Sequence, residues 1–561
     1  MADKKKPAMC PMVGWYDPIQ LGRTAVDVAV STLFGKNADY RLMEALATPD
    51  SDDIEQTEGG KRPDEYGVYS FDDADSIWID YVADVGDGWN STYAVAYSVG
   101  REALEVDGAG KLPRGEVLVF GGDEVYPVAH RNVYRDRLVE PFESALADSG
   151  ERFPHVFAVP GNHDWYDSLV SFTRLFCSRR WFGGWKTCQE RSYFALRLPQ
   201  HWWLIGTDVQ LESDIDIPQV KYFKKVATQM LPQDRIILCT AEPHWIYATT
   251  YGKDDSNINE DNLAFLENNI FCRKISVFLS GDLHHYRRHE NSERRQKITA
   301  GGGGAFLHPT HGLDVSLLKD GYRLKAAYPT ISESKAIAWG NLAFLLKNWK
   351  FGLLTAALYT LTCWSVMANL SGFGVHETWP AIKTAIYASI SKPAPVFWIG
   401  AVFFGFVFFT DTHSKVYRCI AGPIHGLAHL ACTFVIGWIA TYLTVVILHR
   451  PFQSTYQLVP AGAIIFVLGW VVGSIVIGLY LLISLNVFKR HANEAFSALA
   501  NPDWKNFLKL RIDSDGSLTI FPIGIRRVPR RWQETNGIPR FEGEDPNATP
   551  PALIETPVVI K

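Results

Sequence analysis

The sequence predicts an α/β sandwich followed by a domain of four transmembrane helices. Two observations support this prediction. Short apolar runs alternate with helix-like stretches as far as about residue 310, and long uncharged runs begin after about residue 340. Alternating buried strands and helices are typical of α/β folds, whereas about twenty apolar residues span a bilayer as a helix. The mean hydropathy of −0.04 therefore averages a soluble part and a membrane part.

The overall composition excludes several classes of protein. Hydrophobic residues make up 47% and charged residues 20% of the 561 residues, which is an ordinary globular balance. The 44 glycines and 30 prolines are too few for a collagen-like or low-complexity chain. The net charge of −5 gives no nucleic-acid footprint. Eight scattered cysteines without a CxxC pair indicate a reducing compartment rather than a disulfide framework or a zinc ribbon.

Changes in composition divide the chain into four parts. Residues 1–65 combine an apolar stretch with an acidic loop and are expected to form an N-terminal extension, with no signal peptide. Residues 66–330 carry the α/β pattern, and residues 340–490 carry the uncharged runs. Residues 491–561 are expected to form a C-terminal cytoplasmic tail with short strands, of which residues 541–561 are expected to be disordered.

The strands of the α/β domain are predicted from short apolar runs that each end in a polar cluster. These runs are Ile77–Ala83, Val117–Phe120, Val156–Val159, Trp202–Ile205, Ile236–Leu238, Ile275–Leu279 and Ile298–Ala300. In α/β sheets, ligands collect beyond the carboxyl ends of the strands. Functional residues are therefore expected in the loops that directly follow these runs.

Four transmembrane helices are predicted near residues 350–370, 393–410, 424–448 and 461–487, where long runs lack Asp, Glu, Lys and Arg. Buried core helices are the alternative, but four such runs in succession favour a membrane. Lysines and arginines flank the predicted spans unevenly, and the positive-inside rule then places the α/β domain and both termini in the cytoplasm. Because no span contains a charged residue, the spans are expected to serve as an anchor rather than a transport path.

Two patterns within the predicted spans leave alternatives open. His425 and His429 lie four residues apart on one helical face, where interfacial placement is a simpler interpretation than metal or heme ligation. Gly469 and Gly473 form a small-residue pattern that supports close helix packing or dimerisation.

Five polar segments follow the predicted strands and offer oxygen or imidazole donors. They are Asp84-Val-Gly-Asp-Gly88, Gly122-Asp-Glu-Val-Tyr126, Gly161-Asn-His-Asp164, Glu242-Pro-His244 and Gly281-Asp-Leu-His-His285. Such donors suit manganese, iron or zinc. One polar turn after a strand is usually only a turn or a helix cap, but five in register indicate a metal site.

These segments resemble the signature of the calcineurin-like metallophosphoesterases, which runs Asp-x-His or Asp-x-Gly, Gly-Asp, Gly-Asn-His-Asp/Glu, a lone His and Gly-His-x-His. The first two segments look closest to the purple-acid-phosphatase forms, Asp-x-Gly and Gly-Asp-x-x-Tyr. The resemblance covers about residues 75–305. It implies the family's four-layer α/β sandwich and a centre of two divalent or trivalent metal ions (Mn, Fe or Zn) that hydrolyses a phosphate mono- or diester.

Carried across by position, the resemblance implies two metal sites that share Asp123 as the bridging ligand. Asp84 and His284 would belong to the first site. The Asp-x-Gly form supplies no ligand at its third position, so Tyr126 or the nearby Asp87 would provide the missing ligand. The alternative for Tyr126 is that its ring only packs against its neighbours.

The second implied metal site contains Asn162, His244 and Asp282. Asp282 stands where the family has histidine, so it adds negative charge and lowers the Lewis acidity of the ion bound there. His163 resembles the substrate-facing histidine of the family, and Asp164 would orient its imidazole and raise its pKa.

A glycine-rich segment follows the last motif. Residues 301–304 are four glycines, and His308 and His311 come shortly after them. Two interpretations are open. The glycine backbone could approach a phosphate or metal closely, with histidines that reach the site, or the segment could be a flexible turn with surface histidines.

Taken together, these features predict a membrane-anchored, metal-dependent phosphoesterase that faces the cytoplasm. Anchoring beside the bilayer makes a lipid or membrane-associated phosphate ester a candidate substrate. The alternative is a catalytically degenerate phosphoesterase that acts as a membrane scaffold or sensor, because Asp282 replaces a histidine ligand. A transporter with a regulatory domain is a further alternative, against which the uncharged spans argue.

Overall fold

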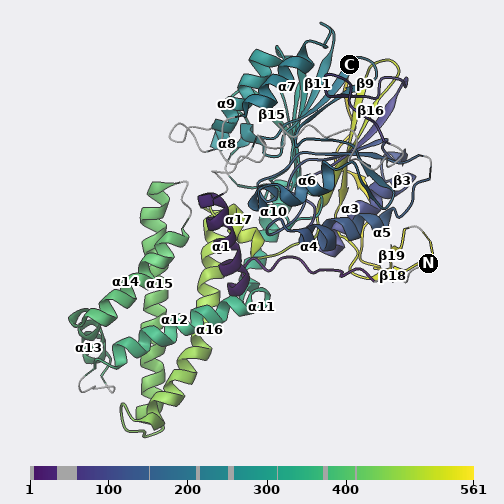
Figure 1. Ribbon diagram of the computed structural model, residues 1–561. Helices are drawn as coiled ribbons and strands as arrows, with labels where there is room; N and C mark the ends of the chain where they lie inside the picture. Colours follow the sequence, from purple (N-terminus) through teal and green to yellow (C-terminus); the bar gives the residue numbers. More distant parts are fainter. Residues whose placement is uncertain are drawn as a thin grey trace. The chain divides into compact units, whose positions relative to one another are not determined.

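The computed structural model describes residues 6–34, 60–150, 152–209, 215–250, 258–312, 314–370, 377–410, 414–537 and 539–561. The chain forms two compact units. The first, here called the sheet unit, comprises Met1–Val13, Arg23–Ser334 and Ala500–Lys561, and the second, the helical unit, comprises Gly14–Gly22 and Lys335–Leu499 (Figure 1). Residues 35–59, in the expected N-terminal extension, lie outside the described residues.

Two large sheets form the centre of the sheet unit. The eight-stranded sheet has the order β1-β9-β10-β11-β12-β14-β13-β15. Its strands are β1 (Val68–Ser70), β9 (Phe194–Leu198), β10 (Trp202–Gly206), β11 (Arg235–Cys239), β12 (Ile275–Ser280), β13 (Tyr286–Glu290), β14 (Gln296–Ala300) and β15 (Arg323–Tyr328).

The nine-stranded sheet has the order β20-β17-β16-β2-β5-β6-β8-β7, and β21 also pairs with β17. Its strands are β2 (Ile77–Val82), β5 (Val117–Phe120), β6 (His155–Ala158), β7 (Trp181–Phe182), β8 (Trp185–Thr187), β16 (Lys505–Ile512), β17 (Leu518–Ile525), β20 (Ala552–Leu553) and β21 (Val558–Ile560). Two small hairpins complete the strands: β3 (Ala103–Val106) with β4 (Gly110–Pro113), and β18 (Trp532–Glu534) with β19 (Phe541–Gly543).

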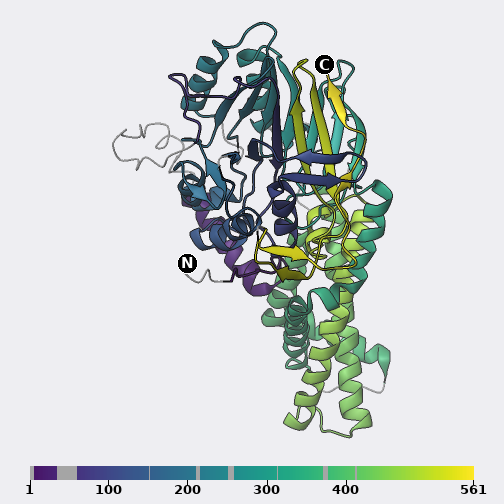
Figure 2. The same ribbon diagram turned by 90° about the vertical axis from the view of Figure 1, so that its right-hand side faces the viewer.

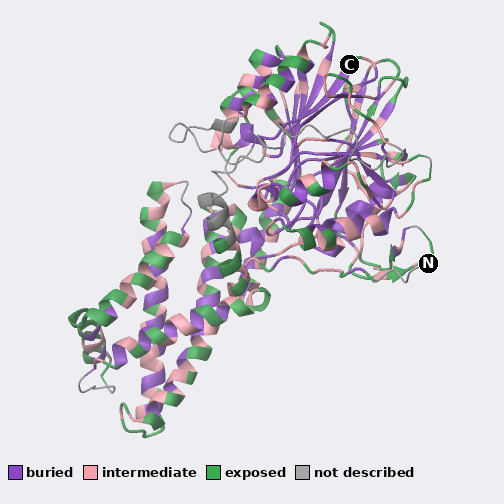
Figure 3. Ribbon diagram, viewed as in Figure 1, coloured by how far each residue is buried: buried purple, intermediate pink, exposed green. Residues whose placement is uncertain are grey.

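The two sheets pack face to face, and helices cover their outer faces. One apolar core contains inward side chains of both sheets, such as Val119 of β5 and Ile237 of β11. Figure 3 shows the strands mostly buried and the helices exposed on their outward sides. This arrangement confirms mixed α/β architecture. The helices of this unit are α3 (Trp89–Gly100), α4 (Arg131–Tyr134), α5 (Glu140–Ala145), α6 (Val170–Phe176), α7 (Ile217–Ala227), α8 (His244–Thr250) and α9 (Ile258–Phe265).

Parallel pairing brings the carboxyl ends of the central strands together. β2, β5 and β6 are parallel neighbours in one sheet, and β10, β11 and β12 are parallel neighbours in the other. Parallel strands are buried on both faces, which explains their continuous apolar runs. The loops that follow these strands therefore meet along one edge of each sheet.

The C-terminal residues are part of the sheet unit. β16 runs antiparallel to β2, with Leu508 opposite Tyr81, and Figures 1 and 2 show the yellow C-terminal strands among those of the N-terminal half. The expectation that residues 541–561 are disordered is wrong, because they contain β19, β20 and β21. The pairing strands are too distant in sequence for a local pattern to reveal their association.

The helical unit contains two helices that are long and apolar enough to cross a membrane, Lys415–Ile447 and Thr455–Asn486. A third candidate is the pair Trp379–Ser391 and Pro393–Phe409, which is bent by 94° and is either a broken span or a re-entrant loop. Among the described residues, the four-span prediction is therefore not confirmed. The helices of this unit are α11 (Phe344–Lys347), α12 (Trp349–Met367), α13 (Thr378–Ser391), α14 (Pro393–Phe409), α15 (Lys415–Tyr442, continued to Ile447 by a π-helical turn), α16 (Thr455–Asn486) and α17 (Ala492–Ser497). Two helices, α1 (Pro18–Phe34) and α10 (Ile331–Ala338), have residues in both units.

Local features explain both departures from the predicted spans. α12 carries polar residues on the side that packs on α16, where a Cβ on Gly469 would lie 2.9 Å from the Cβ of Tyr359 and one on Gly473 would lie 2.6 Å from Thr355 Oγ1. The glycine pattern thus serves close packing within the chain. α14 has only 17 residues and begins at Pro393, after a break that counting charges cannot detect.

Candidate metal centre

The five polar segments lie in the loops after β2, β5, β6, β11 and β12, as the sequence predicts. Hydrogen bonds connect these loops to one another. The Asp84 N–H donates to Gly122 O (2.9 Å), and the His163 N–H donates to Asp123 Oδ1 (2.9 Å). Asp282 N lies 2.9 and 3.0 Å from the two carboxylate oxygens of Asp84, which joins a loop of one sheet to a loop of the other. The segments therefore form one cluster.

The hydroxyl of Tyr126 lies at the centre of this cluster. Its Oη is 2.9 Å from Asp84 Oδ1, 3.1 Å from Asp123 Oδ2 and 3.0 Å from His284 Nε2. His284 Nε2 is also 3.5 Å from Asp84 Oδ1. All four side chains are buried. The structure thus brings together the four residues expected at the first metal site, and Tyr126 contacts the three others rather than only packing.

Three aspartates of the cluster have left-handed backbone conformations. The φ angles are 56° at Asp84, 53° at Asp123 and 65° at Asp282. This conformation costs on the order of 1–2 kcal/mol for a residue with a Cβ, and such strain concentrates at functional sites. Each of these residues directly or closely follows a strand, so the turn aims its carboxylate at the space between the loops.

Gly86 explains why the first motif ends without a ligand. Its φ is +23°, and a Cβ there would lie 2.2 Å from the backbone oxygen of Glu124. Since backbone cannot yield as a flexible side chain can, no residue larger than glycine fits. The hydroxyl of Tyr126, 2.9 Å from Asp84, is the group that the structure supplies beside this position.

Asp87, the other carboxylate considered for the first site, is engaged elsewhere. Its Oδ1 accepts a hydrogen bond from the Val13 N–H (2.7 Å), and its Oδ2 accepts one from the Phe306 N–H (3.1 Å). Burial raises the pKa of Asp87 to about 6. Asp87 therefore fastens the N-terminal segment and the glycine-rich loop beside the cluster.

The residues expected at the second metal site each have a polar neighbour. Asn162, His244 and Asp282 each hydrogen-bond a side chain outside the expected ligand set. These partners are Tyr166 (3.2 Å from Asn162 Nδ2), Thr240 (3.3 Å from His244 Nε2) and Tyr247, which donates to Asp282 Oδ2. Sequence reasoning missed these polar partners because tyrosines and threonines beside a strand end usually pack in the core.

His163 is oriented by a backbone carbonyl. Its Nδ1 lies 2.6 Å from Pro127 O, so Nδ1 carries the hydrogen, and burial lowers the imidazole pKa to about 4. The sequence predicts that Asp164 orients this ring and raises its pKa; the Asp164 charge does act to raise the pKa of His163, but burial outweighs it, and among the described residues no hydrogen bond between Asp164 and the ring orients it. The Asp164 carboxylate accepts hydrogen bonds from the N–H groups of Gly161 (2.9 Å) and Glu124 (3.2 Å) and from Tyr134 Oη (2.5 Å).

The glycine-rich segment approaches the first-site loop closely. A Cβ on Gly301 would lie 2.4 Å from Asp84 Oδ2. Beyond the glycines, Phe306 O accepts a hydrogen bond from His284 Nδ1 (2.7 Å), and the His308 ring stacks on the His284 ring at 3.9 Å. His311 is buried beside Ser334, 2.7 Å from its Oγ. The backbone of the glycine-rich segment therefore lies close to Asp84, and His308 lies beside the cluster.

The charge of the cluster indicates what it can hold. Burial and the neighbouring carboxylates raise the pKa values of Asp84 and Asp123 well above the usual range. Within the described residues, no three acidic, imidazole or thiol side chains lie close enough together to hold an ion as they stand, and the Tyr126 hydroxyl lies between them. The donors are nonetheless hard oxygens with one imidazole, and their crowded negative charge would be relieved by a cation. The residues fit a metal ion chemically.

The sequence matches the profile of one protein family. Residues 77–286 match the sequence profile of the family described as calcineurin-like phosphoesterase. No curated protein sequence matches the chain.

Solved structures show only distant likeness. GAP50, the anchor in the inner membrane complex of Plasmodium, is 13% identical, with a TM-score of 0.32 over 44% of this chain and 78% of that one. Purple acid phosphatase PPD1 from seeds of yellow lupin (Lupinus luteus) is 13% identical, with a TM-score of 0.27 over 41% of this chain and 45% of that one. PhoD is 11% identical, with a TM-score of 0.27 over 41% and 58%. The family match agrees with the order of the five motifs: residues 77–286 of this chain form a calcineurin-like phosphoesterase domain.

Proposed function

We propose that this protein is a membrane-anchored hydrolase that cleaves phosphate mono- or diesters at a centre of two metal ions. The observation that carries this proposal is the convergence of Asp84, Asp123 and His284 on the Tyr126 hydroxyl. The family match supports phosphoester hydrolysis, and the two or three apolar helices support membrane association. Placement of the sheet unit and both termini in the cytoplasm, and a lipid or membrane-associated substrate, remain part of the proposal.

The residues that would hold the ions follow from the cluster. Asp84, Tyr126 and His284 would hold one ion, and Asp123 would bridge to the second. The second ion would also be held by Asn162, His244 and Asp282. In such centres, bound ions polarise the phosphate ester and make a hydroxide nucleophile available near neutral pH. Manganese, iron and zinc all suit this donor set.

The remaining polar groups would position the substrate. Because Nδ1 of His163 donates to Pro127 O, its Nε2 is the atom that can accept a hydrogen bond or take up a proton. Asp164 holds the loop that carries His163 and Asn162 through its bonds to backbone N–H groups. His163 would act on the substrate, and Asp164 would act through the loop.

A scaffold or sensor without catalytic activity is the second candidate. It is favoured by the carboxylate at Asp282, which is engaged by the Tyr247 hydroxyl. Such a protein would keep the fold and hold one ion or none.

Metal analysis and a substrate panel on the detergent-purified full chain distinguish the two candidates. We expect two metal ions per chain and hydrolysis of an aryl phosphate mono- or diester. Asp123→Asn should lower the rate at least a hundredfold (about 2.7 kcal/mol) because the bridging carboxylate is lost. Asp261→Asn, at an exposed position in α9, is the matched control and should leave the rate unchanged. Activity retained in Asp123→Asn would refute the assignment, and one ion or none per chain without hydrolysis would support the scaffold.

A further inference from the structure

The helical unit carries the side-chain pattern of a helix at a membrane surface, on α13. The interfacial placement expected for His425 and His429 is not what the structure shows, because these two residues of α15 are only 2% and 0% exposed. α13 (Thr378–Ser391) instead leaves the direction of α14 by 94° and has three sides of different chemistry.

The inner side of α13 consists of small residues that pack within the unit. Ala381 and Ala388 are each 2% exposed, and Ser389 is 8% exposed. Ala388 belongs to one apolar cluster with Val366 of α12 and Ile436 of α15. Small residues let helices approach one another closely, which is typical of helix contacts in membranes.

The outer side of α13 carries two exposed stripes that run side by side. The isoleucine stripe and the lysine stripe consist of Ile382, Ile386 and Ile390, and of Lys383, Tyr387 and Ser391, respectively. Residues four apart lie on the same face of a helix, so each stripe is continuous. The three isoleucines are 41%, 54% and 68% exposed. An apolar stripe beside a polar stripe is the pattern of a helix that lies along a lipid–water boundary.

The isoleucine stripe borders an apolar cavity of about 420 Å³ between α12, α13 and α15. Ile382 and Ile386 line this cavity together with Val366 of α12 and with Phe434 and Trp438 of α15. An apolar cavity of about 150 Å³ is already large enough to hold benzene, so the acyl chains of surrounding lipids can fill this one. The isoleucine stripe is therefore the side of α13 that suits hydrocarbon.

The lysine stripe has the composition of a headgroup-facing side. Lys383 Nζ lies 5.5 Å from the centre of the Trp379 ring, which is 65% exposed, and Tyr387 is 70% exposed. Trp and Tyr are enriched at membrane interfaces, where lysine extends its ammonium group toward water. Thr378–Ser391 contain no Asp or Glu, and the next residue, Lys392, is exposed. Headgroup phosphates would complement these positive charges.

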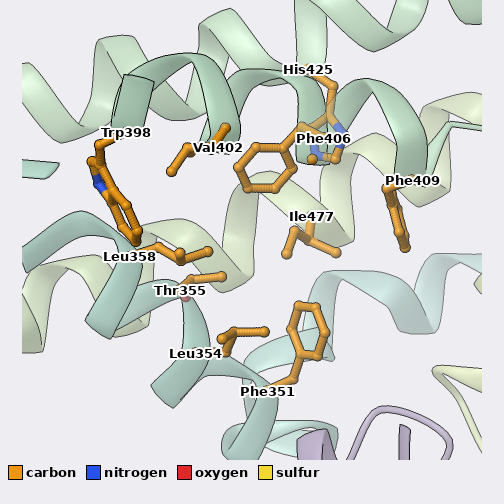
Figure 4. A pocket seen from close by; sticks show the side chains of 12 residues that line it. Phe351, Leu354, Thr355, Leu358, Trp398, Val402, Phe406, Phe409, His425 and Ile477 are labelled. Carbon is orange, nitrogen blue, oxygen red and sulfur yellow. The ribbon is translucent and has the colours of Figure 1, made fainter. Parts of the chain in front are cut away.

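α14 runs from the bend across the helical unit without help from α13. Near its start, Trp398 Nε1 donates to Thr362 Oγ1 of α12 (3.0 Å), and at its end the Phe409 ring lies 5.5 Å from the ring of His491, which follows α16. Between these points, α14 and α12 line an apolar cavity of about 310 Å³ (Figure 4). The 17 residues of α14 measure about 26 Å at 1.5 Å each, close to the roughly 30 Å of a hydrocarbon core.

We propose that α13 lies in the plane of the membrane at the boundary between headgroups and hydrocarbon, and that α14 alone crosses the bilayer. The isoleucine stripe faces acyl chains, and the lysine stripe faces headgroup phosphates. If α13 crossed the bilayer instead, Lys383 would lie among acyl chains, where a charge is costly. The proposal rests on the membrane anchoring in the proposed function and does not depend on hydrolysis.

Cysteine scanning of the full chain tests this placement in nanodiscs of phosphatidylcholine and phosphatidylglycerol. Single cysteines are introduced at the three neighbouring pairs of the two stripes: Ile382 and Lys383, Ile386 and Tyr387, and Ile390 and Ser391. A charged, membrane-impermeant maleimide is the probe, and peptide mass spectrometry reads each site separately from the native cysteines.

The in-plane position predicts a difference within each pair. The lysine-stripe member should react at least about tenfold faster, because a charged reagent is excluded from hydrocarbon. A helix that crosses the bilayer would instead give similar rates within each pair and a gradient from the first pair to the last. Similar rates within pairs, or faster reaction of the isoleucine positions, would overturn the proposal.

Two controls separate this result from the membrane anchoring itself. Asp261→Cys, at an exposed position of α9, should react fast, and Val467→Cys, at a 54% exposed position of α16, should be protected. Fast labelling of Val467→Cys would overturn the anchoring and the placement of α13 together, whereas similar rates within pairs beside a protected Val467→Cys would overturn the placement alone. If one variant does not fold, the other two pairs still decide, and a protein without hydrolytic activity gives the same readout.

Discussion

Replacing Lys509 by Met tests whether a buried ion pair holds the C-terminal strand β16 in the sheet. Lys509 Nζ lies 2.7 Å from Asp80 Oδ1 of β2 and 3.0 Å from Pro113 O. The side chains of Lys509 and Asp80 are 0% and 2% exposed. Removing one partner of such a pair leaves an uncompensated buried charge and costs about 3–5 kcal/mol. At about 2 °C per kcal/mol for a large domain, Tm should fall by roughly 6–10 °C.

The assay is thermal unfolding of the full chain in detergent, with Arg511→Met as the control. Arg511 lies two residues further along β16, and its ion pair with Asp513 is exposed at 44% and 25%. An exposed pair contributes about 0–1 kcal/mol, so this control should lower Tm by no more than about 2 °C. Equal, small shifts in the two variants would refute the reasoning.

The same variant gives a pH signature. Burial already raises the pKa of Asp80 in spite of the opposing Lys509 charge, and Lys509→Met raises it further. A carboxyl group with a raised folded pKa contributes stability below its unfolded value of about 4, and this stability is lost as pH rises through the folded value. The Tm deficit of Lys509→Met should therefore be larger at about pH 8 than at about pH 5. A deficit independent of pH would contradict the role of Asp80.

Three further predictions concern individual residues. Gly86→Ala should lower both Tm and metal content, because the added Cβ would lie 2.2 Å from Glu124 O. The control Gly537→Ala should change neither, because a Cβ there meets nothing within 4 Å. Equal behaviour of the two variants would contradict the steric argument. Tyr126→Phe should lower the Tm of chelator-treated protein by roughly 2–6 °C, since buried groups lose a partner at about 1–3 kcal/mol, and an unchanged Tm would refute its central place. Burial lowers the pKa of His155 to about 4. As pH falls below about 6.5, the unfolded state therefore takes up a proton at His155 before the folded state does, and the free energy of unfolding should fall by up to about 3 kcal/mol by pH 4. His155→Phe should remove that part of the acid sensitivity of Tm, and a pH profile unchanged by the substitution would contradict it.

The first half of the cluster could be predicted because each residue lies within a few positions of the end of an apolar run. Asp84 and Asp123 follow neighbouring parallel strands of one sheet, and His284 follows a strand of the other sheet, so the pattern places each residue at the carboxyl end of its own sheet. The position of Tyr126 between them depends on the course of a loop. Sequence reasoning therefore left its role open between ligation and packing.

The roles of Asp87 and Asp164 could not be predicted, because they depend on contacts that no motif records. Asp87 bonds the Val13 N–H of an N-terminal segment, and Asp164 bonds N–H groups of its own and a neighbouring loop. A carboxylate in a motif offers the same atoms to a metal and to the backbone. Only the folded geometry decides between these uses.

The membrane prediction rests on runs without charged residues and therefore cannot detect bends or polar packing faces. The run at Pro393–Phe409 is apolar, but it meets the preceding helix at 94°. His425 and His429 were identified as one helical face, and their enclosure by rings from α14 and α16 required the tertiary structure.

The order of the strands along the chain has a consequence for biosynthesis. β2, which carries Asp80, is made early. The strand that covers its edge is β16, which carries Lys509, and Lys509 follows Asp80 by 429 residues in the sequence. At about 5–20 residues per second, translation leaves that edge uncovered for roughly 20–90 s, while the apolar helices emerge from the ribosome. An uncovered strand edge invites pairing with other chains. We therefore expect the nascent protein to need a chaperone until its last sixty residues are made, and delivery to the membrane to precede completion of the metal centre's sheet.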